Sequence, residues 1–246
     1  MRNKLLMSTL LGAVLSIPSV SWATVYFGED LGAGESTALS TFPNASAARA
    51  SFLSSLYGVG TEDFESFSDG DTSLSLNFPS AGTATLNGGG SVNRVVSGTN
   101  GAGRYATSGI NYWETGSGFS IDFTAPIAAF GFYGIDIGDF GGQVTVTLMG
   151  GITTTYNVGN TINGLGGGVL FWGVVDASNP FTRITFGNTA AGTDYFGFDD
   201  MTIGSVSQVC GQAGNPPCPS VPESSSIALI GMGLLGLVWS RRRKFS

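Results

Sequence analysis

The side chains best equipped for chemistry in this sequence are carboxylates. The chain of 246 residues contains no histidine, which excludes Ser-His-Asp and Cys-His catalysis and histidine-ligated zinc within it. Residues 24–220 hold sixteen acidic residues against four arginines and no lysine, a net charge of −12. Such a surface repels nucleic acid and anionic lipid and can attract divalent cations. The same balance is also typical of an acidic secreted protein without a bound metal.

Three carboxylates are candidates for a calcium site. Glu65 lies in the segment DFESF, expected as the first strand of the body, and Asp199 and Asp200 lie in FGFDDMTI, expected as the last. Alternation puts Asp199 on the face of Met201 and Ile203, toward the core, where a carboxylate is costly unless it is paired or bound to metal. Calcium takes roughly six to eight oxygen ligands, from carboxylates, carbonyls and water. The alternative is that these carboxylates accept hydrogen bonds from backbone amides or face solvent.

Two further acidic pairs are weaker metal candidates. They are Asp69 with Asp71, around a glycine, and Asp136 with Asp139, after a long apolar run. Neither matches the spacing of a twelve-residue calcium-binding EF-hand loop. Aspartates in such segments more often make turns.

An aromatic segment is the candidate for binding sugar. Tyr112 and Trp113 stand between Asn111 and Glu114, with Arg104-Tyr105 upstream. Aromatic faces beside polar groups can bind sugar rings, but the favoured interpretation is that both rings pack in the core. No spacing singles out a carboxylate pair for hydrolysis, so we predict no catalytic residues and no enzymatic activity.

The two cysteines lie close together in a stretch rich in glycine and proline. Cys210 and Cys218 could close a small disulfide loop in an oxidising compartment. Two cysteines alone do not make a zinc site.

Both ends of the chain carry targeting features. Residues 1–23 have a basic start, an apolar run and small residues before a cleavage site, the pattern of a secretory signal peptide. Near the other end, residues 227–239 form an apolar run of 13 residues. A full membrane span needs about 20 residues, so this transmembrane-type helix is marginal. Arg241 to Lys244 follow it and should stay in the cytoplasm.

The body between the ends predicts an all-β domain. One short helix is expected after Phe42, capped by Asn44 and ended by Gly58 and Gly60. Alternating strand patterns joined by turns, without helices between them, then indicate an antiparallel β-sandwich, specifically a jelly roll. The expected strands are 63–67, 74–78, 83–86, 92–96, 119–123, 128–137, 143–148, 152–158, 169–175, 181–186 and 196–203.

The C-terminal residues carry a family resemblance. Val221, Pro222 and Glu223, followed by the apolar run and the basic cluster, resemble the PEP-CTERM sorting signal. That signal usually has a proline where this chain has Ser224. The resemblance implies an exosortase in the inner membrane as the processing partner, besides signal peptidase and the export machinery. It also implies an exported protein, anchored briefly by its C-terminal helix and then placed at the cell surface or outside the cell.

The body resembles a group of PEP-CTERM proteins of unassigned activity, through FPNASAARASFL, EDFESF, FGFYGIDIGDFGGQVTVTL and FGFDDMTIG. It is more loosely similar to jelly-roll carbohydrate-binding modules, which implies structural calcium between the first and last strands. We therefore expect a non-enzymatic surface or matrix protein associated with polysaccharide or biofilm. The alternatives are a carbohydrate-binding module with a defined ligand and a secreted polysaccharide-active enzyme.

The expected divisions of the chain are a signal peptide (1–23), a lead with a short helix (24–60), the sandwich (61–204), a linker (205–220) and the sorting tail (221–246).

Overall fold

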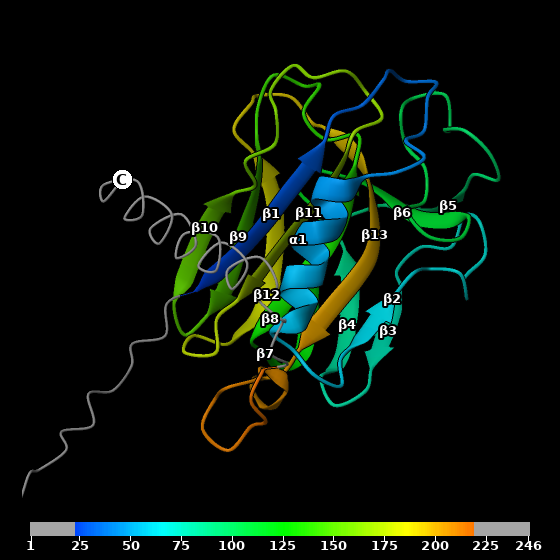
Figure 1. The fold of residues 1–246 in the computed structure, drawn as a ribbon. Coiled ribbons are helices and arrows are strands. Elements are labelled where there is room, and N and C mark those ends of the chain that lie inside the picture. The colour runs from blue at the N-terminus through cyan, green and yellow to red at the C-terminus, as the bar shows by residue number, and fades with distance from the viewer. Residues whose placement is uncertain (1–22, 219–246) are drawn as a thin grey trace, which may run out of the picture.

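The computed structural model describes residues 23–218, and within them the chain forms two antiparallel sheets and one long helix (Figure 1). The first sheet has seven strands in the order β1-β11-β8-β13-β6-β5, with β2 pairing beside the second half of β13. Its strands are β1 (Thr24–Asp30), β2 (Gly60–Glu62), β5 (Ser91–Arg94), β6 (Asn111–Gly116), β8 (Ala129–Ile135), β11 (Val169–Val175) and β13 (Tyr195–Gly204).

The second sheet has six strands in the order β10-β9-β12-β7-β4-β3. They are β3 (Ser75–Phe78), β4 (Gly82–Asn87), β7 (Ser120–Ile127), β9 (Val144–Gly150), β10 (Thr153–Asn157) and β12 (Phe181–Asn188). The predicted jelly-roll-like β-sandwich is therefore confirmed. Among the residues described, no helix is long and apolar enough to cross a membrane. The predicted signal peptide, apart from Ala23, and the predicted C-terminal helix lie outside those residues.

The space between the sheets is filled mainly by aromatic rings. Phe198 of β13 is fully buried and lies within 6.4 Å, between ring centroids, of Phe64, Phe119, Phe130, Phe132 and Phe186. Val144, Val146 and Leu148 of β9 are buried on the same side, as their alternation predicts. Burial of large aromatic side chains is the main stabilising contribution in such a core.

A second core lies between the first sheet and helix α1 (Pro43–Ser54), which covers β1 and β11 (Figure 1). With the second sheet on one face and α1 on the other, β8 and β11 are buried along their whole length. This explains their continuous apolar sequences. Phe52 of α1 is fully buried in the second core, above the paired glycines Gly131 and Gly173.

Helix α1 begins differently from the prediction. Pro43 is its first residue and Phe42 its N-cap, so Asn44 lies inside the first turn instead of capping it. The cap comes from β1, because the carboxylate of Asp30 accepts hydrogen bonds from the backbone amides of Asn44 and Ala45, at 3.3 and 2.9 Å. A carboxylate at this end of a helix satisfies free amides and complements the helix dipole. This contact is tertiary and leaves no local signature.

Three other expectations about the elements need correction. Residues 24–30 were expected in a lead outside the sandwich, but they form edge strand β1, which pairs along its whole length with β11. Residues 63–67 were expected as a strand, but the strand is β2, which ends at Glu62, and Glu65 lies in the turn that follows. No strand was predicted over residues 111–116, which form β6.

Candidate functional site

The predicted calcium ligands Asp199 and Asp200 lie at a β-bulge in the middle of β13. The register against β8 shifts between Asp199 and Thr202, and Asp200 has a left-handed φ of 49°. An extra residue in one strand reverses the side-chain alternation beyond it. Asp199 therefore points toward the α1 side of the sheet, the face of its partner Tyr133, and not to the face of Met201 and Ile203 as predicted.

Asp199 is fully buried and already surrounded by donors. One carboxylate oxygen accepts from the backbone amides of Thr107 and Ser108 and from the Thr107 hydroxyl, at 2.7, 3.2 and 2.8 Å. The other accepts from the amide of Asp200 at 2.8 Å. A carboxylate offers about four lone-pair positions. The four donors occupy these positions, which a metal ion would otherwise need. Burial raises the pKa of Asp199, and the Thr107 and Asp200 donors oppose that rise.

Glu65 and Asp200 also serve the loop that covers the bulge. Glu65 accepts from the backbone amides of Ile110 and Asn111, at 2.7 and 2.6 Å. Asp200 accepts from the Ser108 hydroxyl at 2.9 Å and lies 3.8 Å from the Arg49 guanidinium of α1. The three carboxylates hold the 107–111 loop, but their oxygens do not form a compact metal-ligating group. This arrangement agrees with the alternative of hydrogen bonds to backbone amides.

One compact acidic group does occur in residues 23–218, and we call it the acidic cluster: Glu35, Asp136 and Asp139. One carboxylate oxygen from each lies within 4.8 Å of the others. Glu35 follows β1 and Asp136 follows β8. Both strands pair antiparallel with β11, so they run in the same direction. They therefore finish at the same end of the sandwich, the top in Figure 1.

Asp136 is the buried member of the acidic cluster. It has a left-handed φ of 67°, and its carboxylate accepts from the backbone amide of Gly167 at 2.8 Å. Burial raises its pKa to about 7, and Asp139 and Glu35 add to the rise. A Cβ on Gly103 would lie 2.2 Å from the Asp136 carboxylate. Glycine is therefore required there, both for space and for its positive φ of 77°.

Arg104 connects the acidic cluster to β6. Its guanidinium donates to Asp136 at 3.2 Å, to Glu114 at 2.9 Å and to the carbonyl oxygen of Tyr195 at 3.2 Å. Tyr112, a predicted sugar ligand, donates its hydroxyl to Glu114 at 3.2 Å. Burial and the Glu114 charge disfavour the phenolate and raise the pKa of Tyr112 above its ordinary value.

The predicted sugar-binding rings are in the interior. Tyr112 is 0% and Trp113 1% exposed, and Trp113 packs in the aromatic core beside Phe64 and Phe119. Neither ring can serve as a surface platform, because both are buried. This agrees with the favoured interpretation that they belong to the core.

A cleft of about 400 Å³ lies beside these buried rings. Tyr195, the first residue of β13, is 57% exposed there. Tyr195 was not predicted as a binding residue, because exposure at the start of a buried strand has no sequence signal. The rest of the lining is small and polar: Thr72, Gly88, Gly89, Gly90, Ser91, Glu114, Thr115, Gly116, Ser117 and Thr193.

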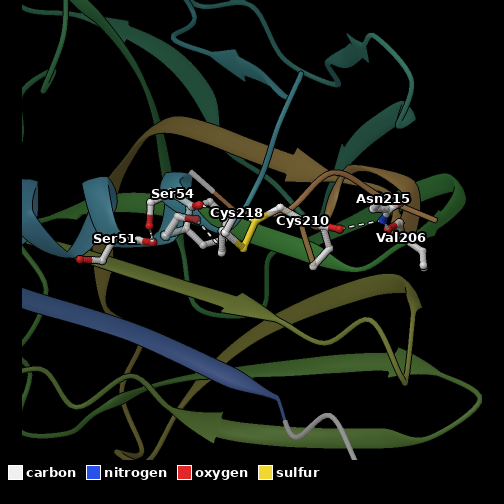
Figure 2. Close-up of a disulfide and its surroundings, with 9 residues drawn as sticks. Ser51, Ser54, Val206, Cys210, Asn215 and Cys218 are labelled. Carbon is white, nitrogen blue, oxygen red and sulfur yellow. Dashed lines mark hydrogen bonds between the residues drawn. A yellow bond between two sulfur atoms is a disulfide. The ribbon is translucent and has the colours of Figure 1, made fainter. Parts of the chain in front are cut away.

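The segment after β13 is folded against the domain, although it was predicted as a linker. A disulfide joins Cys210 and Cys218 next to the last turn of α1 (Figure 2). The amide of Cys210 donates to the carbonyl oxygen of Ser55, and Asn215 donates to the carbonyl oxygens of Val206 and Val209. The chain therefore leaves the domain at the end opposite the acidic cluster.

The remaining predicted residues have simpler positions. Asp71 accepts from the backbone amide of Ser68 at 2.8 Å, and Asp69 lies exposed in the same turn. The predicted sorting residues Val221, Pro222 and Glu223 lie outside the described residues. No sequence pattern marked Glu35 as a site residue. Asp136 and Asp139 lie beside it in space but are about a hundred positions away in the sequence.

Comparisons with known proteins identify the tail. The PEP-CTERM protein-sorting motif matches residues 220–243. A search of curated proteins finds no match. Among solved structures, the chain is similar to the K2 cleaved adhesin domain of Lys-gingipain, with 15% identity and a TM-score of 0.38 over 59% of this chain and 97% of that one. At this identity and score, the likeness says nothing about what this chain binds.

Proposed function

We propose that this protein, which carries a PEP-CTERM sorting motif, is a non-enzymatic component of the cell surface or extracellular matrix. The motif indicates exosortase-dependent sorting to the cell surface and implies an exosortase partner. The match to residues 220–243 is the observation that carries the proposal. Association with extracellular polysaccharide or biofilm is the finer part of the proposal. It is supported by the charge of the body, whose excess of carboxylates is typical of an acidic secreted protein.

The folded domain ends close to the sorting motif. Cys218 is held by its disulfide beside α1, two positions before residue 220, where the motif match begins. Little free chain therefore separates the sandwich from the tail. The proposed order is export, brief retention by the apolar run, cleavage at the motif and release of the sandwich to the surface.

Processing of the tail tests the sorting proposal. In a host with an exosortase, we expect the mature protein to lack Arg241 to Lys244 and the variant Glu223→Ala to keep them and stay with the membrane. Intact mass spectrometry of the surface and membrane fractions measures both. The Ser224→Pro variant, which restores the usual proline, should be processed at least as completely as the natural chain. A surface form of the natural protein that retains the basic C-terminus would contradict the proposal.

Carbohydrate binding is the second candidate function, and the cleft at Tyr195 favours it. An exposed aromatic ring beside hydroxyl and carboxylate side chains suits a sugar ring, whose apolar face stacks on the aromatic and whose hydroxyls need polar partners. The ligand would then bind at the surface of β6 and β13, not at Tyr112 and Trp113.

A glycan array with purified protein tests the cleft. If the cleft binds sugar, Tyr195→Ala should weaken binding of any positive glycan by about tenfold or more. Phe27→Ala is the matched control, because Phe27 is a 40% exposed aromatic on β1, at the other edge of the sheet. Equal glycan binding by the natural protein and Tyr195→Ala would show that the cleft is not the sugar-binding site.

A further inference from the structure

The acidic cluster carries far more negative charge than its surroundings neutralise. Its members Glu35, Asp136 and Asp139 bring one oxygen each within 4.8 Å of the others. Glu114 and Asp194 lie in the same network, since Arg104 links Glu114 to Asp136 and the Asp136 and Asp139 charges both act on Asp194. Five carboxylates against one guanidinium leave an excess of four negative charges. The three carboxylates of the cluster repel one another at this separation, and a bound cation would relieve that repulsion.

Arg104 cannot be that further cation. Its guanidinium is already divided between Asp136, Glu114 and the Tyr195 carbonyl oxygen. In residues 23–218, neither Glu35 nor Asp139 forms an ion pair with an arginine or lysine. The charge of these two exposed carboxylates is therefore available to a ligand from solution.

Asp194 provides an independent indication of a missing cation. The residue is only 4% exposed, and its Oδ2 atom is buried without a hydrogen-bond donor. Its carboxylate lies near Asp136 and Asp139 and beside the backbone amide of Gly138, which stands between those two aspartates. The Asp194 carboxylate thus faces the 136–139 loop. A buried carboxylate oxygen with no donor is costly unless a cation or a proton compensates it.

We propose that Glu35, Asp136 and Asp139 bind one calcium ion, with the buried Asp194 carboxylate facing the same ion. The chain has no histidine and both cysteines are in the disulfide, so the site offers only oxygen, which selects calcium, magnesium or manganese over zinc. Several carboxylates from separate loops suit the variable coordination of calcium better than the strict octahedron of magnesium. Remaining ligands would be carbonyl oxygens or water.

The proposed site differs from the one expected from the sequence and does not depend on the sorting proposal. It joins the loops after β1 and β8 to the residue that precedes β13, at the end of the domain away from the tail. Calcium there would fix three segments that are far apart in the chain. Loops 99–103 and 166–167 would be fixed as well, because they donate hydrogen bonds to Glu35 and Asp136.

Calcium titration of the full chain in detergent, stripped beforehand with a chelator, tests the proposal. By calorimetry we expect one calcium per chain, and magnesium should bind at least tenfold more weakly. At a hundredfold excess over Kd, calcium should raise Tm by about 5 °C or more. No heat and no Tm shift, or equal responses to the two ions, would overturn the assignment.

Conservative variants locate the ion. Asp139→Asn and Glu35→Gln change exposed carboxylates, so both should fold, and each should weaken calcium binding tenfold or more. Asp69→Asn is the matched control, an exposed loop aspartate outside the cluster, and should bind as the natural chain does. Loss of binding in Glu65→Gln with normal binding in Asp139→Asn would move the ion to the bulge and contradict the proposal.

Discussion

The substitution Asp199→Ala is expected to lower the free energy of unfolding by about 3–5 kcal/mol. It leaves the amides of Thr107, Ser108 and Asp200 without the acceptor they share in the natural protein. A buried donor without an acceptor costs about 1–3 kcal/mol. The three losses do not add fully, because the 107–111 loop can rearrange and admit water. Removing a buried carboxylate also relieves its desolvation, which keeps the net cost below the simple sum.

The loss at Asp199 should be equal in calcium and in chelator. Asp199 acts as a hydrogen-bond acceptor in this structure, so calcium at the acidic cluster should stabilise Asp199→Ala and the natural protein by the same amount. Urea denaturation under both conditions measures this. Asp122→Ala is the control, since Asp122 is a half-exposed aspartate 3.5 Å from Arg183 and its loss should cost less than about 1 kcal/mol. A defect in Asp199→Ala that appears only with calcium present would indicate a metal ligand.

The bulge shows why the role of Asp199 could not be predicted from the sequence. Alternation along FGFDDMTI, counted back from Met201 and Ile203, assigns Asp199 to the core face. Phe198 and Met201 both face that core, three positions apart, because the bulge inserts a residue between them. A bulge depends on the partner strand, so the pattern of one strand cannot reveal it.

Strands with strong local patterns were predicted well, and the edge strand β1 was not. Residues 169–175 form β11 with the predicted bounds. A short apolar run flanked by glycine is typical of a buried strand. Strand β1 was missed, since TVYFGED is half-exposed and its partner lies about 145 residues away in the sequence. The acidic cluster could not be predicted in full for the same reason, because its members are far apart in the sequence. Asp136 and Asp139 were recognised as candidates, but Glu35 joins them only because β1 and β8 run parallel on either side of β11.

The two ends of the domain carry different features. The disulfide and the docked residues 205–210 close the end from which the sorting tail continues. The acidic cluster and the Tyr195 cleft lie toward the other end, where β13 begins. Both candidate sites therefore lie away from Cys218, the last residue that the structure describes before the sorting motif.

Packing of α1 on the first sheet leads to the other large expected effect. Phe52→Ala should lower the free energy of unfolding by about 3–5 kcal/mol, because it removes a fully buried ring and leaves a cavity. The ring packs against Tyr26 and Phe171, with centroid distances of 5.7 and 5.5 Å. Loss of this contact should loosen α1 from β1 and β11. Urea denaturation measures the loss, and Phe52→Leu, which keeps most of the apolar volume, should lose clearly less.

Gly131 lies beneath the Phe52 ring and allows a specific test of this packing. A Cβ on Gly131 would lie 2.9 Å from the Phe52 ring and 2.8 Å from the Phe171 ring, so Gly131→Ala alone should cost about 1–3 kcal/mol by overpacking. In the Phe52→Ala background the added methyl enters the vacated space. The double variant should therefore be at least about 1 kcal/mol more stable than the two separate losses imply. Gly151→Ala is the control, since a Cβ there meets nothing within 4 Å. Additive losses from Phe52→Ala and Gly131→Ala would mean that the glycine does not serve the helix contact.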